Sequence, residues 1–162
     1  MSTSASPRTE LKFATLAEVI ERLEALQRNG YTSLGKWNLA QVCEHLSDWA
    51  CYMLDGYPKV PFPISLMLWG MKITTGRSML RKIINTGKMA AGGPTIGQTV
   101  HPAAGLDDAR SLQRFKETAE RFEAHLGAFH PSPLFGELSA KDGLALHLVH
   151  CAHHVSFLAP TA

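Results

Sequence analysis

The sequence predicts an all-α protein whose simplest architecture is a four-helix bundle. Four segments repeat apolar residues three and four positions apart, which places them on one face of a helix, and their ends carry residues typical of helix caps. No segment alternates apolar and polar residues with comparable regularity, so no strand is expected. The 162 residues are expected to form a single domain, residues 1–162, in which residues 1–10 are a flexible tail.

The first two predicted helices carry cap signals at both ends. One begins after Thr15 and the other at Asn38, and in each case a Glu or Gln stands three residues later, as in a capping box. The predicted ends, Asn29-Gly30 and Asp55-Gly56, place a glycine where helices commonly stop. Each segment has one apolar face between these limits, so both helices should bury one side in the core.

The last two predicted helices are also amphipathic. The third spans about Leu106 to Phe129, and its apolar residues, with Leu126 near the end, alternate spacings of three and four. This pattern is typical of a helix packed in a bundle. The fourth begins after Ser139 and runs to about Leu158.

A long crossover, residues 57–104, joins the second and third predicted helices. Connections longer than about 12–15 residues usually have structure or function of their own, and short helices are expected over residues 64–73 and 78–84. No apolar run approaches the roughly 20 residues needed to cross a bilayer, so no membrane span is predicted. The glycine-rich residues 90–94 predict a flexible loop that lacks the ending of a nucleotide-binding P-loop.

Composition narrows the classes of function. The formal net charge of +2 gives no general signal of nucleic-acid binding. The three cysteines form no Cys-x-x-Cys pair, and residues 1–7 lack the apolar stretch of a secretion signal. These features predict a cytoplasmic protein with free thiols. The expected partner is a small-molecule ligand, and the sequence also allows a homodimer.

The clearest functional signal is a group of four histidines within residues 147–154. His150 and His154 are four residues apart, so their side chains lie on the same face of a helix and can bind one metal ion. A third ligand must come from another segment. His45 is the best candidate, because it lies at the edge of the apolar face of the second predicted helix.

Other pairings of ligands remain open at the level of sequence. His147 with His150, His150 with His153, and His147 with Cys151 also have spacings of three or four. His147 and His154 are separated by about 10 Å along a helix and cannot share an ion. A hydrogen-bonded structural cluster without metal is the competing interpretation.

The middle of the chain is basic. No acidic residue occurs between Asp55 and Asp107, and this interval contains six Lys and Arg residues. Arg77, Arg81 and Lys82 share one predicted amphipathic turn and are candidates to bind an anionic substrate, because Arg can hold a carboxylate through two parallel hydrogen bonds. A solvated basic face and a weak attraction to anionic lipid are the alternatives.

Two motifs resemble the DinB/YfiT-like superfamily of metal-binding proteins and, more narrowly, a branch of it with unknown function. Residues 35–46 resemble its Gly-x-Trp-(Ser/Asn)-x-x-Gln-x-x-x-His-Leu motif, and residues 146–154 resemble its last-helix motif. Residues 92–95 and 130–136 resemble loops of that branch. Where those proteins usually have a Trp early in the last helix, this chain has Gly143, which should loosen the start of the helix and open space near the site.

The resemblance implies a bundle with up-down-down-up order and a metal site formed by His45, His150 and His154. Three imidazoles leave a coordination position open, and they suit Zn, Ni, Fe or Co. Characterised relatives suggest a thiol-dependent S-transferase or isomerase that acts through a low-molecular-weight thiol bound to the metal as thiolate. A metal-dependent hydrolase using metal-bound hydroxide, and a non-enzymatic binding protein with a structural metal, are the alternatives.

Overall fold

The computed structural model describes residues 8–91 and 97–161, which are mostly helical. The helices are α1 (Leu16–Asn29), α2 (Leu39–Asp55), α3 (Ile64–Met71), α4 (Arg77–Thr86), α5 (Asp108–Glu123) and α6 (Ala140–Val155), with a π-helical turn η1 (Lys72–Gly76) and a 3-10 turn η2 (Gly97–Thr99). The strands are β1 (Tyr31–Ser33), β2 (Phe129–Ser132), β3 (Gly136–Leu138) and β4 (Leu158–Pro160).

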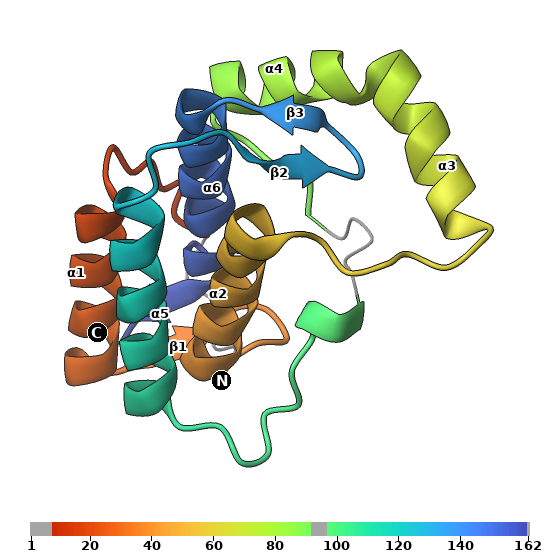
Figure 1. Cartoon of the computed structure of the whole chain (residues 1–162). Coiled ribbons are helices and arrows are strands. Elements are labelled where there is room, and N and C mark those ends of the chain that lie inside the picture. The colour runs from red at the N-terminus through yellow and green to blue at the C-terminus, as the bar shows by residue number, and fades with distance from the viewer. Residues whose placement is uncertain (1–7, 92–96, 162) are drawn as a thin grey trace.

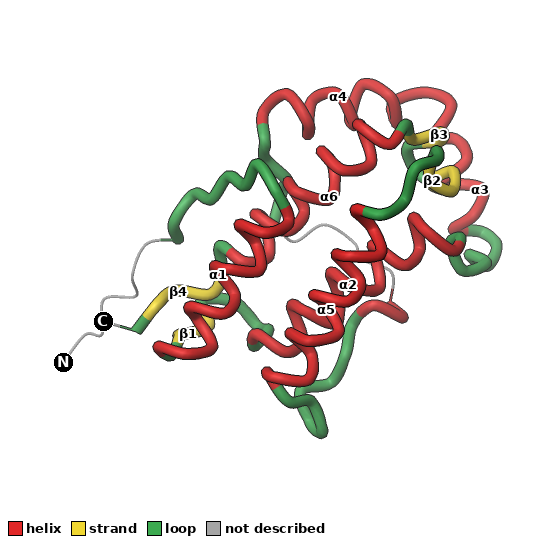
Figure 2. The backbone as a smooth tube through the Cα atoms, turned by 60° about the vertical axis from the view of Figure 1, so that its left-hand side comes forward, coloured by secondary structure: helices red, strands yellow, loops and turns green. Residues whose placement is uncertain are grey.

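The core lies among the helices α1, α2, α5 and α6. The helix α2 packs along α5, α1 contacts both α5 and α6, and α2 also contacts α6. Figure 1 shows these helices gathered on one side of the molecule, and Figure 2 shows the same arrangement from a second direction. Each contributes a fully buried side chain, namely Leu23, Leu46, Phe115 and Val155. The apolar faces predicted from sequence therefore meet in one core.

The predicted limits of α1 and α2 are confirmed. The Thr15 side chain accepts a hydrogen bond from the backbone N–H of Glu18 at the start of α1. At the start of α2, Asn38 and Gln41 each accept from the backbone N–H of the other, which completes the capping box.

The predicted end of the third helix is wrong. The helix α5 ends at Glu123 rather than at Phe129, and the side chain of Leu126 is 96% exposed. The helix stops at Glu123, and Phe129 enters the core from strand β2, where its ring stacks on Phe122. The spacing of Phe129 fitted a helix, but the residue is buried as part of a strand.

The expectation of no strands is also wrong, because two short antiparallel pairs are present. The strand β1 pairs with β4, and β2 pairs with β3. The helix α6 accordingly ends at Val155, and Leu158 lies in β4 opposite Ser33. Strands of three or four residues are too short to show a clear alternation of apolar and polar residues.

The crossover between α2 and α5 contains the short helices that the sequence predicts. The helix α4 packs against α6, whereas α3 extends away from the other helices (Figure 1). No helix among the described residues has both the length and the apolar character that crossing a membrane requires. The predicted tail lies outside the described residues up to position 7, and so do residues 92–96, which hold most of the predicted glycine-rich loop and the family-like residues 92–95.

Candidate metal centre

Three histidines from two helices meet at one point. His45 comes from α2, and His150 and His154 lie one turn apart on α6. Their nearest ring nitrogens all lie within 4.8 Å of one another, so the three imidazoles could hold one metal ion. His45 is buried, and the other two are partly buried. Among the described residues, these three side chains form a cluster with the composition and spacing of a metal site.

The spacing of the nitrogens suits a small divalent cation. With metal–nitrogen bonds of roughly 2.0–2.1 Å, two ligand nitrogens are about 2.9 Å apart at a right angle and about 3.4 Å apart in a tetrahedron. The Nε2 atoms of His45 and His150 are 3.2 Å apart, which is within this range. All three nitrogens lie within 4.8 Å of one another, so small rotations of the rings would bring any wider pair into this range.

The orientation of His45 is set by a backbone carbonyl. The Nδ1 atom of His45 lies 3.0 Å from the carbonyl oxygen of Thr99 in η2. A carbonyl oxygen can only accept, so Nδ1 carries the proton and the Nε2 lone pair is free to face the other histidines. Such a second partner fixes the tautomer and the ring direction of a metal-binding histidine.

A polar network holds the segment that carries Thr99 against α2. The side chain of Gln41 donates to the carbonyl oxygen of His101 at 2.6 Å, and Nε2 of His101 lies 2.6 Å from a carboxylate oxygen of Asp48. The second carboxylate oxygen of Asp48 accepts from Arg114 on α5. Asp48 therefore supports His45 through this segment, and its negative charge also opposes the lowering of the pKa of His45.

Aromatic rings surround the histidines. The Trp37 ring stacks on His154 with centroids 5.2 Å apart and also lies 4.7 Å from His45. The Trp49 ring stands edge-on to His150 at 5.8 Å. The indole N–H of Trp49 is buried and has no hydrogen-bond partner among the described residues. The histidines thus lie among aromatic rings, and the N–H of Trp49 is a buried donor without a partner among the described residues.

Burial keeps the three imidazoles neutral. It lowers the pKa of His45 to about 4, although the hydrogen bond to Thr99 opposes this shift. Burial, together with the charge of His45, lowers the pKa of His154 to about 2, and burial holds the pKa of His150 well below its usual value. Neutral imidazoles have the lone pairs that a metal needs, so the centre is prepared to bind a cation at neutral pH.

His147 and Cys151 do not join the cluster. The Nε2 atom of His147 lies 3.7 Å from the sulfur of Cys151, and its ring stacks on Phe122. The Nδ1 atom of His147 is buried and has no hydrogen-bond partner among the described residues. Burial also raises the pKa of the Cys43 and Cys151 thiols, as expected of inert core cysteines.

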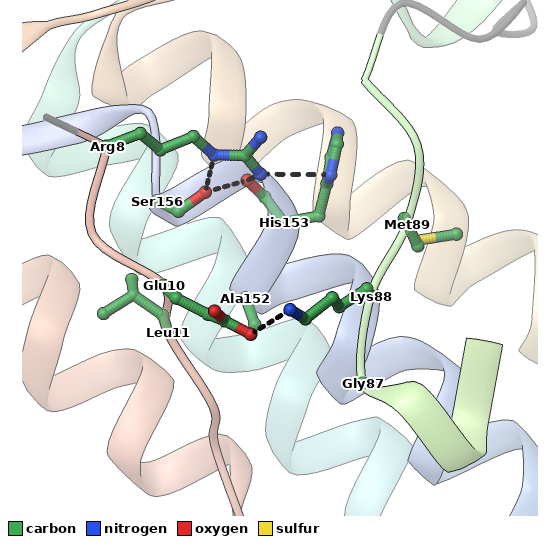
Figure 3. A pocket seen from close by; sticks show the side chains of 9 residues that line it. All are labelled: Arg8, Glu10, Leu11, Gly87, Lys88, Met89, Ala152, His153 and Ser156. Atoms are coloured by element: carbon green, nitrogen blue, oxygen red, sulfur yellow. Dashed lines mark hydrogen bonds and ion pairs between the residues drawn. The ribbon is translucent and has the colours of Figure 1, made fainter.

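His153 faces a different feature, a surface pocket of about 230 Å³ between the chain near Arg8, the loop after α4, and the end of α6. Figure 3 shows Arg8 hydrogen-bonded there to the Ser156 hydroxyl and to His153. Across the pocket, Lys88 pairs with Glu10 at 2.9 Å. The polar groups of the pocket thus already have partners within the chain.

The predicted substrate-binding cations lie on α4. Arg77 donates to the backbone carbonyl of Glu137 at 2.7 Å, and the side chains of Arg81 and Lys82 are exposed. Within the described part of the chain, no hydrogen bond or ion pair joins these three residues to the histidines. Their role in binding a substrate stays a prediction.

The expected open space at Gly143 is filled. A Cβ atom at this position would overlap the buried ring of Phe129 and would lie 3.0 Å from the terminal carbon of Met53. The helix also begins normally, because Ser139 accepts from the backbone N–H of Asp142. A glycine is therefore required at this position by the close approach of Phe129.

Two neighbours of the centre were not identified from the sequence. Nothing in the sequence singles out the carbonyl of Thr99, because every residue has a backbone carbonyl. Trp37 did have a signal, because it is the Trp of the motif at residues 35–46 that also contains His45, but the motif does not say that its ring contacts the histidines.

The fold and the site define a mostly helical protein with a three-histidine centre that could hold a metal ion. Over residues 5–161 the chain matches the model of a family described as a protein of unknown function (DUF1569), and it belongs to that family. No curated protein and no solved structure matched the chain.

Proposed function

We propose that this protein binds one divalent metal ion through His45, His150 and His154, and that the centre acts on a small molecule. The observation that carries the proposal is the convergence of three buried or partly buried imidazoles whose pKa values are all lowered. Structural zinc sites usually have four protein ligands, whereas catalytic ones have three. Among the described residues the cluster contains three, which favours a centre with an open position.

We also propose that α1, α2, α5 and α6 form a single-domain four-helix bundle of the DinB/YfiT-like kind. The pairwise packing of these helices and the long crossover between α2 and α5 support it. The resemblance of residues 35–46 and 146–154 to the motifs of that superfamily is the second line of support.

The chemistry follows from the open position. A divalent ion supplies Lewis acidity, which lowers the pKa of a thiol or a water molecule bound to it. The chain contributes the surroundings: Thr99 fixes the ring of His45, and the rings of Trp37 and Trp49 shield the histidines from bulk water. We propose that the N–H of Trp49, which is buried without a partner among the described residues and whose ring lies beside His150, donates to the bound small molecule.

A low-molecular-weight thiol is the ligand we favour, with transfer or isomerisation as the reaction. The resemblance to thiol-dependent relatives is the support for this choice. Two alternatives differ in what they require. A hydrolase would use metal-bound water in place of the thiol. A non-enzymatic protein would need only the metal, and a structural cluster without metal would need only the hydrogen bond between His45 and His150. The cytoplasmic location predicted from sequence is compatible with three free cysteines.

Cobalt substitution distinguishes the thiol-dependent enzyme from these alternatives. The protein is freed of metal with a chelator, loaded with Co²⁺, and titrated with glutathione and with other low-molecular-weight thiols while the absorption spectrum is recorded. A new sulfur-to-cobalt charge-transfer band supports the thiol proposal. A spectrum that no thiol changes contradicts it and leaves hydrolysis or a structural ion. His154→Ala serves as the control, because it should lose both the cobalt spectrum and the band.

A further inference from the structure

Exposed apolar side chains are concentrated on one short segment, residues 62–73, which we call the apolar arm. Six of its large side chains are between 48 and 78% exposed: Phe62, Ile64, Leu66, Met67, Trp69 and Ile73. In the rest of the described chain, three large hydrophobic residues are exposed, and they lie apart from one another in sequence: Val100, Leu126 and Leu144. Soluble proteins rarely expose large apolar patches unless the patch contacts a partner or a membrane.

The arm projects from the rest of the molecule. It consists of the turn before α3, the helix α3, and the start of η1, and α3 has no buried residue. Figure 1 shows α3 standing clear of the other helices. Leu66, Trp69 and Ile73 are spaced by three and four residues, so they share one side of the helical turn. These three exposed side chains therefore lie next to one another on one face of the arm.

The charge around the arm has one sign. From Gly56 to Leu106 the chain has six Lys or Arg residues and no acidic residue, whereas the remainder of the chain has all 14 acidic residues. Lys59 and Lys72 flank or lie within the arm, and the exposed Arg81 and Lys82 follow on α4. A surface that combines large apolar side chains with positive charge suits a partner that has an apolar interior and a negatively charged surface.

We propose that the apolar arm docks on the surface of a membrane that contains anionic phospholipids. The apolar side chains would enter the boundary between headgroups and acyl chains, where Trp is favoured, and the cations would face the phosphate and carboxylate groups. A second copy of the chain fits less well, because pairing through the same arm would bring two positive segments together. Docking of this kind needs no membrane-spanning helix.

The proposal is independent of the metal centre. The arm lies on α3 and η1, whereas the histidines lie on α2 and α6. Membrane docking would therefore persist in a protein whose centre has been emptied by a chelator.

Vesicle sedimentation tests the proposal. The full-length protein is mixed with vesicles of phosphatidylcholine alone, or with about 30% phosphatidylserine, at an ionic strength near 0.15 M. We expect binding to the anionic vesicles that is at least several-fold stronger than to the neutral ones. The double variant Leu66→Ser/Trp69→Ser should lose it. Its matched control is Leu126→Ser, which changes an even more exposed leucine, at 96%, outside the arm and should leave binding unchanged.

The charge requirement has its own pair of variants. Lys59→Glu/Lys72→Glu should reduce binding to anionic vesicles, whereas Lys141→Glu, an exposed position in the first turn of α6, should not. The proposal is overturned if wild-type protein does not sediment with anionic vesicles, whether it is a monomer or a dimer in solution. Equal binding to both kinds of vesicle, or binding that survives the change of Leu66 and Trp69, would overturn it as well.

Discussion

The Nδ1 atom of His45 lies 3.0 Å from the carbonyl oxygen of Thr99, a residue 54 positions further along the chain. This contact ties the long crossover to the candidate metal centre. The crossover is thus more than a connection between helices, because one of its backbone groups decides which nitrogen of His45 is free. The same segment is held against α2 by two further side chains, since Gln41 and Asp48 both bond to His101.

The first prediction concerns the anchor of Thr99. His101→Ala removes the contact with Asp48, so the segment that carries the Thr99 carbonyl should be held less firmly. Loss of a second partner of a metal-binding histidine typically weakens metal affinity by about 10- to 100-fold. We expect a decrease near the lower limit, because the carbonyl itself remains. The dissociation constant is measured by competition with a chelator, and His130→Ala, at an exposed position, is the control. Unchanged affinity in His101→Ala would refute the role of the anchor.

The second prediction concerns pH. Burial lowers the pKa of His147 in the folded protein to about 4, and its ordinary value is 6.5. Between these values the unfolded chain binds the proton and the folded chain does not, so the free energy of unfolding falls as the pH falls through this window. The limit is about 1.4 kcal/mol per pH unit for one histidine.

His147→Leu isolates this contribution. Because the Nδ1 atom of His147 is buried without a partner among the described residues, its replacement should cost little at pH 7.5 and could stabilise the fold by about 1 kcal/mol. Between pH 6 and pH 5 the variant should lose less stability than the wild type. Urea unfolding of metal-free protein at several pH values provides the measurement. Identical pH slopes for the two proteins would contradict the prediction.

The third prediction concerns packing at the start of α6. Gly143→Ala gains helix propensity of up to about 1 kcal/mol but forces a Cβ into the Phe129 ring, and overpacking a core typically costs about 1–3 kcal/mol. We expect a net loss of stability on thermal unfolding. Gly70→Ala in α3 is the matched control, since a Cβ there would meet no atom within 4 Å, and it should stabilise slightly. Equal stability of both variants would show that Phe129 moves aside freely.

The fourth prediction concerns Trp49. Trp49→Phe keeps the ring near His150 but removes the indole N–H, so the metal content should stay while the affinity for a thiol falls. A net hydrogen bond of about 0.5–1.5 kcal/mol corresponds to a decrease of roughly 2- to 10-fold. The thiol titration of the cobalt protein gives the affinity. If the variant binds thiols as tightly as the wild type, Trp49 does not contact the bound molecule.

Much of this structure could be predicted from local sequence signals. The caps at Thr15 and Asn38 act within one turn, and the spacing of His150 and His154 is a property of a single helix, so both were accessible. The pairing of β1 with β4 and the early end of α5 depend on contacts between distant segments, which no local pattern encodes. The same reason explains why the Thr99 carbonyl could not be foreseen.

The central claim is that His45, His150 and His154 bind one divalent ion, and metal analysis of untagged protein tests it most directly. The protein is freed of metal, dialysed separately against low concentrations of Zn²⁺, Ni²⁺ and Fe²⁺, and its metal content is measured by mass spectrometry. We predict about one ion per chain for the wild type and for His125→Ala, and a large loss in His45→Ala, His150→Ala and His154→Ala. Full occupancy in a folded His45→Ala protein, or no bound metal in the wild type with any of the ions, would contradict the account.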